Sequence, residues 1–389
     1  MTNIRDTLKK NTMLIALAVV MLLFEILIEL NGKGSLFAPS NITNLILQNS
    51  YVVILATGML LCILTGGNID LSVGSVVVLV GAVAGTLIVN LKVNIYLSML
   101  ICLLVGVLIG AWQGFWIAYI RIPAFIVTLA GMLLWRGLAH VILNGLTISP
   151  FPGNYLQYFT SFLPSDPNIA FMVSLIVGAA VFLLYAALQI AGRVQKVRKG
   201  YEVLALPLFI VKLVLLFAVI AALALLLGRH KGIPVVLILL AVVVLAYDYY
   251  TSKTVPGRHL YAMGGNEKAA KLSGINTNKV LFFAYMNMAF LSAVAALVCV
   301  ARFNSAAPSA GTNYELEAIG ACFIGGASAY GGTGTVGGAV VGAIFMGVLN
   351  NGMSILGIDA NWQRAVKGFV LLVAVVFDVV SKKQRSAKA

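Results

Sequence analysis

The sequence predicts an all-α polytopic membrane protein with about twelve transmembrane helices, in a range of ten to fourteen. Of its 389 residues, 61% are hydrophobic and only 10% are charged, which leaves too few polar side chains to cover a water-soluble fold of this size. Apolar runs of about 20 residues, the length that crosses roughly 30 Å of hydrocarbon, recur along the whole chain. We therefore expect a single transmembrane domain over residues 1–389, without a separate soluble domain.

A hydropathy window of about 19 residues places the spans in order. The first, at 12–30, is interpreted as a span and not a signal peptide, because Glu25 and Glu29 interrupt its end and no small-x-small cleavage site follows. The Gly-rich stretches at 65–75 and 317–338 are too interrupted for plain helices, so we expect broken or re-entrant segments there. The expected spans are 12–30, 43–64, 71–91, 95–120, 123–142, 169–190, 203–227, 233–250, 279–302, 317–330, 335–355 and 363–380.

The distribution of Lys and Arg indicates the orientation, because these residues are enriched in cytoplasmic segments. With the N-terminus inside, 17 of them lie in cytoplasmic segments and 5 in external ones. Both termini are therefore expected to be cytoplasmic. The same clusters account for the net charge of +14, so the partner that they indicate is the anionic lipid bilayer and not a nucleic acid.

The sequence supports no catalytic, metal or cofactor site. The four cysteines lie singly in apolar segments and the three histidines are far apart, so no metal-ligand spacing exists. Residues 332–337 fit G-x-G-x-x-G, but the βαβ context and the acidic ribose ligand of a dinucleotide fingerprint are missing. No G-x-x-x-x-G-K-[ST] motif occurs, so any ATP hydrolysis that drives the protein must come from another subunit. We expect that the chain is not an enzyme.

Glycines recur at every fourth position in several apolar stretches, a spacing that lets helix backbones approach closely in lipid. Gly106, Gly110 and Gly114 form the longest such stripe. At the two breaks we expect glycines with packing or hinge roles, because a side chain would block close backbone approach or a positive φ. These are Gly66, Gly67, Gly74, Gly331 and Gly332.

Residues 253–278 form a long polar insert between spans. Asn266 can cap a short helix whose first turn carries Glu267, and Gly274 can end this helix. A helix of two turns is unstable alone, so the insert is either a solvated loop or a helix that docks into a groove of a cytoplasmic partner. The expected apolar face of this helix consists of Ala269, Ala270 and Leu272.

Four sequence blocks together resemble the permease subunits of ribose- and xylose-type ABC sugar importers. The resemblance covers most of the chain, and the hydrophobic material at 191–250 resembles the longer xylose or multiple-monosaccharide branch. One position departs from the family pattern, because Asn68 stands where Gly or His usually precedes Ile-Asp. The blocks are residues 66–75 (GGNIDLSVGS), 122–132 (IPAFIVTLAGM), 257–276 (from GRHLYAMGGNE to Asn276) and 325–332 (GGASAYGG).

The resemblance implies a permease of the bacterial inner membrane that imports a monosaccharide, xylose- or ribose-like. It further implies a second permease copy in a homodimer, a periplasmic sugar-binding protein and a cytoplasmic ABC ATPase subunit. The polar insert would then couple the permease to the ATPase. The candidate coupling residues are Arg258, Tyr261, Glu267, Ala269, Ala270, Leu272 and Gly274.

For the substrate pathway we expect polar side chains near broken spans, because a carboxylate at such a place faces protein or water and not lipid. Neutral amides also suit sugar hydroxyls without the cost of burying a charge. Asp70 has an alternative role as a cap of the span that begins at Leu71. The candidates are Asn68, Asp70, Ser72, Asn287, Asn350 and Asn351.

Two other classes of protein remain open. An ion-coupled secondary sugar transporter would need a buried carboxylate or histidine relay, and the expected spans offer only Asp70 and acids near span ends. A membrane-embedded enzyme would need a nucleophile paired with a base, or a metal with its ligands, and the sequence shows neither. The blocks at 66–75 and 325–332 also resemble each other weakly, and a parallel repeat would place both near one pathway.

Overall fold

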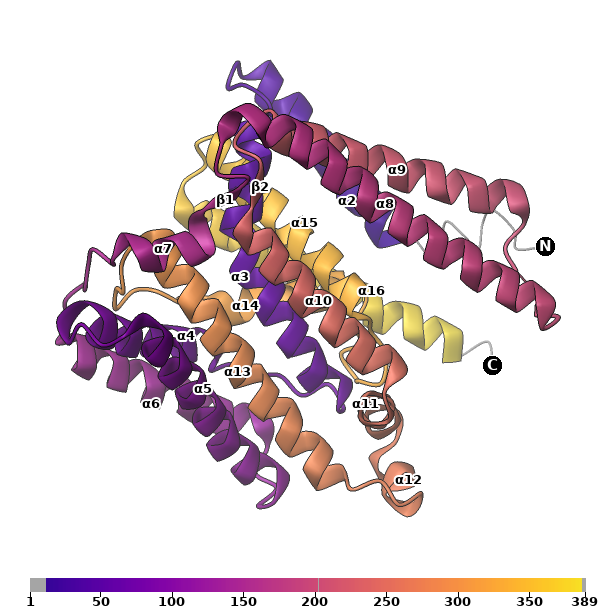
Figure 1. Cartoon of the computed structure of the whole chain (residues 1–389). Helices are drawn as coiled ribbons and strands as arrows, with labels where there is room; N and C mark the ends of the chain where they lie inside the picture. The colour runs from indigo at the N-terminus through magenta and orange to yellow at the C-terminus, as the bar shows by residue number, and fades with distance from the viewer. Residues whose placement is uncertain (1–11, 202, 387–389) are drawn as a thin grey trace.

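The computed structural model describes residues 12–201 and 203–386, and every statement below refers to this part of the chain. It contains helices α2 to α16 and one pair of two-residue strands (Figure 1). Ten of the described helices are long and apolar enough to cross a membrane, which confirms a polytopic all-α membrane protein. Residues 1–11 and 387–389, which form the ends predicted to be cytoplasmic, lie outside the described residues.

The ten spanning helices coincide with ten of the predicted spans. Their bounds differ from the prediction by a few residues at most, except at α8, which continues well past its predicted end at 190. They are α2 (Thr12–Leu30), α3 (Pro39–Leu64), α4 (Val73–Gly85) with its π-helical continuation η1 (Thr86–Asn90), α5 (Ile95–Ala118), α6 (Ala124–Leu143), α8 (Pro167–Arg198), α9 (Leu206–Gly228), α10 (Val235–Lys253), α13 (Thr277–Phe303) and α15 (Val336–Ile355).

The remaining helices include two that were predicted as spans. The span at 317–330 is wrong as a continuous crossing, because α14 (Tyr314–Ile324) has 11 residues and reaches only about 16 Å of a core roughly 30 Å thick. Helix α16 (Ala360–Ser386) covers the predicted span 363–380, but Arg364, Lys367 and Asp378 interrupt its apolar sequence. The others are α7 (Gly153–Thr160), α11 (Val255–Gly265) and α12 (Glu267–Leu272).

Helix α13 lies at the centre of the bundle, packed against α3, α4 and α5 (Figure 1). Gly106, Gly110 and Gly114 of α5 face it, and a Cβ on any of them would lie within 2.9 Å of an α13 atom. This contact confirms the predicted packing role of the stripe. By contrast, α2, α8 and α9 bury few of their apolar side chains, as expected for lipid-facing helices.

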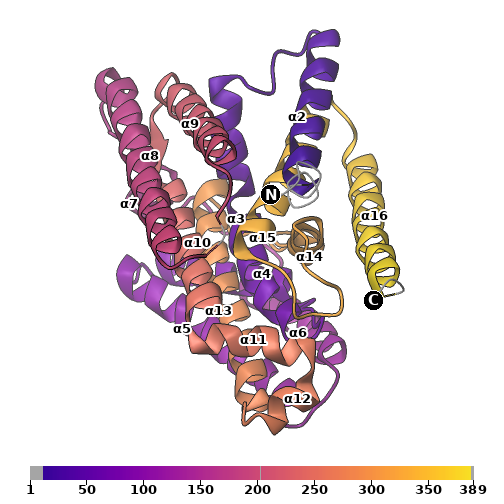
Figure 2. The same ribbon diagram turned by 90° about the vertical axis from the view of Figure 1, so that its right-hand side faces the viewer.

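The two Gly-rich breaks meet at the end of the bundle that carries α11 and α12, which we call the α12 end (Figure 2). The first break comprises residues 65–72 between α3 and α4, and the second comprises residues 325–335 between α14 and α15. The Gly332 N–H donates to the Leu64 carbonyl at 3.1 Å. Both predicted broken segments are therefore present, and they are in contact.

The chain before α14 is re-entrant. Ala306 forms an antiparallel bridge with Ile148, near the end of α4 that is remote from α12. Five residues later, Gly311 lies against Gly74 in the first turn of α4, and the Arg136 Nη2 donates to the Gly311 carbonyl at 3.2 Å. The loop thus passes back into the bundle alongside α4, and α14 starts from inside it.

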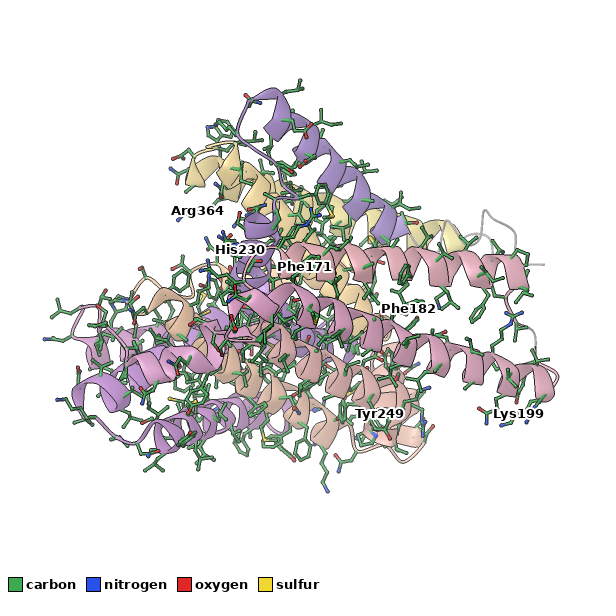
Figure 3. All side chains as sticks on the ribbon, turned by 45° about the horizontal axis from the view of Figure 1, so that its top comes forward. Phe171, Phe182, Lys199, His230, Tyr249 and Arg364 are labelled. Atoms are coloured by element: carbon green, nitrogen blue, oxygen red, sulfur yellow. The ribbon has the colours of Figure 1, made fainter. Side chains whose placement is uncertain are left out.

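Helices α8 and α9 form a hairpin at one side of the bundle (Figures 1 and 2). α8 packs chiefly against α9, and α9 also packs against α3. The base of the hairpin is fixed by β1 (Phe162–Leu163), which pairs with β2 (Ile233–Pro234). The ends of α8 and α9 at Arg198 and Leu206 lie at the far end of the hairpin from this pair, where Figure 3 labels Lys199.

Candidate functional site: the junction at the α12 end

The candidate site is the junction where the first break, the second break and α11 meet, and its contacts are made largely by backbone. Gly67 has a φ of +76°, and a Cβ on it would lie 2.0 Å from the Ala329 carbonyl oxygen. Gly332 has a φ of +69° and lies against the Gly264–Gly265 backbone. Larger residues at Gly67 and Gly332 would therefore be strained and would also separate the segments.

The other predicted hinge glycines lie at the same contacts or in the first turn of α4. Gly66 and Gly331 pack against each other, and both have positive φ values. Gly74 packs against Gly311 of the re-entrant loop, where a Cβ would come within 2.0 Å of the Gly311 carbonyl oxygen. Of this predicted set, four glycines thus form the junction and the fifth joins α4 to the loop.

Helix α11 connects α10 to the junction. Thr254 caps it by accepting from the Gly257 N–H at 3.1 Å, and Pro256 occupies its first turn, where no N–H is needed. The Tyr261 hydroxyl donates to the Gly334 carbonyl at 2.9 Å, and burial raises the pKa of this phenol. Helix α11 was not predicted, since the only helix expected within residues 253–278 was the one that Asn266 caps.

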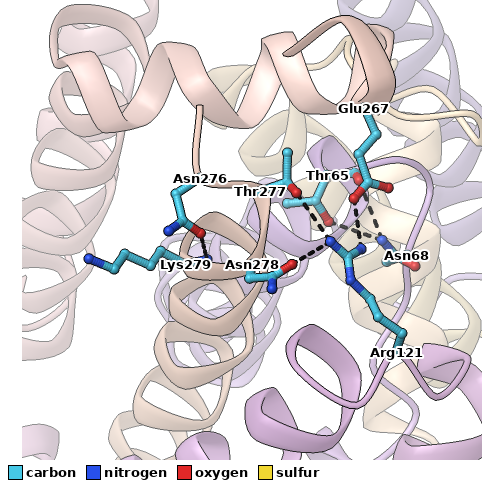
Figure 4. Close-up of polar contacts among 8 residues, drawn as sticks. All are labelled: Thr65, Asn68, Arg121, Glu267, Asn276, Thr277, Asn278 and Lys279. Atoms are coloured by element: carbon cyan, nitrogen blue, oxygen red, sulfur yellow. Dashed lines mark hydrogen bonds and ion pairs between the residues drawn. The ribbon is translucent and has the colours of Figure 1, made fainter. Parts of the chain in front are cut away.

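Helix α12 forms where the sequence predicts it. The Asn266 Oδ1 accepts from the Ala269 N–H at 3.0 Å, and Gly274 follows the helix with a φ of +84°. The Glu267 carboxylate forms an ion pair of 2.7 Å with Arg121, which lies in the turn between α5 and α6 (Figure 4). The predicted cap, first-turn acid and terminating glycine are all present.

Arg121, which was not among the predicted site residues, joins α12 to the rest of the protein. Besides the ion pair, its guanidinium donates to the Thr277 Oγ1 at 3.1 Å and to the Asn278 side chain at the start of α13 (Figure 4). Arg121 and Glu267 are both over 40% exposed, so the pair itself contributes about 0–1 kcal/mol. Its role is to set the position of α12, and only the tertiary fold reveals its partners.

The predicted apolar face of α12 is wrong in part. Ala270 points inward and is 5% exposed, whereas Leu272 is 91% exposed and Ala269 is also exposed. Residues two apart lie on different sides of a helix, while residues three apart share one, so Ala269 and Leu272 form the outer face. Arg258 on α11 is likewise exposed. The α12 end therefore presents Leu272, an exposed apolar side chain on a polar helix.

Asp70 lies at the start of α4, where its side chain has local partners. One carboxylate oxygen accepts from the Ser72 N–H at 2.8 Å and from the Ser72 Oγ at 2.6 Å. The Ser72 Oγ in turn accepts from the Gln113 Nε2 of α5 at 2.7 Å. Asp70 is 1% exposed, and in this conformation it holds Ser72, the N-cap residue of α4, without capping the helix itself. Gln113, a buried amide beside the glycine stripe, was missed.

The remaining pathway candidates do not converge on one place. Asn68 donates to the carbonyl and hydroxyl oxygens of Thr65, in its own turn. Asn287 accepts from the Tyr247 hydroxyl at 2.9 Å and so joins α13 to α10. Asn351 exchanges two hydrogen bonds with Asn41, at 2.9 and 3.0 Å, between α15 and α3.

The last candidate, Asn350, donates to the carboxylate of a partly buried ion pair. The Glu317 Oε1 of α14 accepts from the Asn350 Nδ2 at 3.1 Å and from the Lys367 Nζ of α16 at 2.8 Å, and its Oε2 accepts from the Tyr51 hydroxyl. The side chains of Glu317 and Lys367 are 8% and 21% exposed. Glu317 was predicted only as the first residue of the span 317–330, whereas α14 begins at Tyr314 and includes it within the first turn.

A short helix that starts inside the bundle after a re-entrant loop, as α14 does, is typical of membrane transport proteins. Comparison with known proteins agrees. The family model described as "Branched-chain amino acid transport system / permease component" matches residues 41–375. The chain belongs to this permease family, which is a family of transport subunits and not of enzymes.

Individual relatives match over nearly their full length. The xylose transport system permease protein XylH of Haemophilus influenzae is 38% identical over 372 residues, 96% of each chain. XylH of Escherichia coli K12 is 37% identical, over 96% of this chain and 92% of the relative. The ribose import permease protein RbsC of Escherichia coli K12 is 35% identical over 94% of each chain. No solved structure matches the chain.

Proposed function

We propose that the chain is the transmembrane permease subunit of an ATP-driven ABC importer that carries a xylose- or ribose-like monosaccharide, or several such sugars, into the cytoplasm. The observation that carries the sugar class is the end-to-end match to permeases named for xylose and ribose. The family description names branched-chain amino acids, whereas the relatives that match over nearly the whole chain are named for sugars. The individual relatives are the more specific guide.

The second part of the proposal concerns partners. The sequence has no P-loop, so a separate ABC ATPase subunit hydrolyses ATP. Its docking site is the outer face of α12, because Leu272 is 91% exposed and an apolar side chain on a polar helix suits the groove of a partner. A periplasmic sugar-binding protein delivers the sugar at the opposite end, and a second permease copy completes the pathway.

The third part concerns orientation. The α12 end faces the cytoplasm of a bacterial inner membrane, as do both termini, because that end carries Lys and Arg in excess. In this orientation both breaks lie next to the ATPase contact. Asn68, Asp70 and Ser72 then line the cytoplasmic part of the pathway. Asp70 becomes accessible only when the junction opens, since it is buried in this conformation.

Reconstituted transport tests the proposal. The permease, its ATPase and its binding protein are placed in proteoliposomes, and uptake of radiolabelled xylose, ribose and leucine is measured. Pentose uptake should require ATP and should continue after ionophores collapse the ion gradients. Uptake that needs a gradient and not ATP would instead identify an ion-coupled secondary transporter, and uptake of leucine alone would refute the sugar assignment.

Leu272→Asp tests the docking contact. It would bury an unpaired carboxylate against the ATPase, at a cost of several kcal/mol, and should release that subunit during co-purification. Lys268→Ala, on the same helix, should retain it. Ala270→Asp is a poorer test, because Ala270 packs inward and its replacement would also displace α12. Normal ATPase retention by Leu272→Asp would exclude this face as the contact.

A further inference from the structure

A cleft of about 330 Å³ lies between α8 and α9 near the turn of their hairpin. Toward the base the two helices are in close contact, since a Cβ on Gly178 would lie 2.7 Å from the Ala224 Cβ and the rings of Phe182 and Phe217 are 4.9 Å apart. Figure 3 shows Phe171 and His230 at the base and Lys199 at the tip. The cleft therefore opens at the end of the hairpin that is remote from the central helices.

Three cations line this cleft. The Arg193 Nη1 donates to the Leu204 carbonyl at 2.5 Å, and the guanidinium lies 4.9 Å from the centre of the Phe209 ring. Lys196 lies one turn further along α8, and Lys212 enters from α9. These contacts hold the positive charges at the cleft without neutralising them.

No carboxylate pairs with these cations in the part of the chain that the structure describes, where the two ion pairs involve Arg121 and Lys367. Between positions 169 and 227 the sequence has five Lys and Arg and one acid, Glu202. Position 202 lies outside the described residues. The cleft therefore carries an excess of positive charge, which an anion from outside the chain would neutralise.

The position of the cleft relative to the membrane indicates which class of anion it binds. α8 has 32 residues and is about 48 Å long, so its last turns pass beyond a hydrocarbon core of roughly 30 Å. Lys212 follows the start of α9 at Leu206 by six residues, about 9 Å along the helix. At this depth a long side chain extends its charge to the head groups and lines lipid with its methylenes.

Apolar side chains line the cleft beside the three cations. Leu188, Val203 and Phe209 line it, and Leu188 is 65% exposed. A free inorganic anion would satisfy the charges and leave these side chains uncovered. A phospholipid satisfies both features, because its phosphate carries the charge and its acyl chains cover apolar surface.

We propose that the cleft binds the head group of an anionic phospholipid. Arg193, Lys196 and Lys212 hold the phosphate, and the acyl chains run along the apolar faces of α8 and α9 toward the base of the hairpin. The lipid would stabilise a hairpin that has few protein contacts at its tip. This site is independent of sugar transport and of the ATPase contact.

Native mass spectrometry of the full-length protein in detergent tests the proposal. Dioleoyl phosphatidylglycerol is titrated against dioleoyl phosphatidylcholine, which has the same chains and no net charge. The wild type should bind the anionic lipid at least ten times more tightly, and R193Q/K196Q/K212Q should abolish that preference. The matched control K268Q/K271Q/K279Q removes three charges elsewhere on the same end and should keep it.

Three outcomes would overturn the proposal: equal binding of both lipids, an unchanged preference in R193Q/K196Q/K212Q, or displacement of the lipid by millimolar inorganic phosphate, which would indicate a soluble-anion site. If the triple variant does not fold, the wild type still decides the matter. A photoactivatable phosphatidylglycerol should crosslink within residues 188–212, and crosslinks confined to other regions would exclude the cleft.

Discussion

Replacement of Lys367 by Met tests whether the buried ion pair holds α16 against α14. Lys367→Met keeps an unbranched apolar side chain but removes the cation that lies 2.8 Å from the Glu317 carboxylate. Glu317 would then be left charged and 8% exposed, with only the Tyr51 and Asn350 donors. Breaking a buried pair by removing one partner costs about 3–5 kcal/mol.

The expected value lies toward the lower end of that range. Lys367 is 21% exposed, which weakens its contribution, and two hydrogen-bond donors remain on the carboxylate. We expect a loss of about 3 kcal/mol, observed as a lower apparent melting temperature in detergent. Glu317→Gln/Lys367→Met should recover most of this loss, because it leaves no buried charge.

The assay is the fraction of monodisperse protein after heating, followed by size-exclusion chromatography with fluorescence detection. Lys279→Met is the control, since Lys279 is exposed and forms no ion pair in the described structure. Equal stability of Lys367→Met and wild type, or a double variant less stable than Lys367→Met, would refute the reasoning.

The remaining predictions concern the junction, α12 and orientation. Gly67→Leu and Gly332→Leu should abolish uptake while the protein still inserts, whereas Gly137→Leu, with open space around its Cβ, should transport normally; full uptake by the first two would show that the junction tolerates side chains. Arg121→Ala should accelerate hydrogen exchange in residues 267–276 while changing stability by no more than about 1 kcal/mol, and unchanged exchange would show that α12 is held by other contacts. Cysteine probes at positions 196 and 268 should label only from the cytoplasm and one at 154 only from the periplasm, with little background because the four native cysteines are buried; external labelling at 268 would reverse the assigned orientation.

The spanning helices could be predicted from sequence because lipid imposes length and composition on each of them separately. Hydropathy failed at α14, because apolar residues in a half-helix inside protein resemble those of a full crossing. Hydropathy gave no signal for α11, a short helix within the polar insert that begins with the Thr254 cap and Pro256 in its first turn. The capping residues of α12 were predictable, since a cap depends on neighbours in sequence.

Contacts between distant segments could not be predicted in the same way. Glu317 and Lys367 are 50 residues apart, and Arg121 and Glu267 are 146 apart, so neither pair leaves a local pattern. The glycines of the junction were identified by their type and clustering, but their contacts with Gly264 and Leu64 appear only in the fold. The inward side of Ala270 likewise depends on where α12 rests, although helical spacing already separates it from Leu272.

At the α12 end, the contacts that join the segments of the chain and the side chains that face outward involve different atoms. The segments that meet at the junction are joined through backbone atoms, such as the Gly332 N–H and the Leu64 carbonyl, and through the Tyr261 hydroxyl. The outward side chains of α12 take no part in these bonds. Under the proposed docking of the ATPase on α12, residues 268, 269, 271 and 272 should be exchangeable as a unit: their replacement by those of another permease should change which ATPase subunit binds, while the contacts with α3 and α15 stay intact.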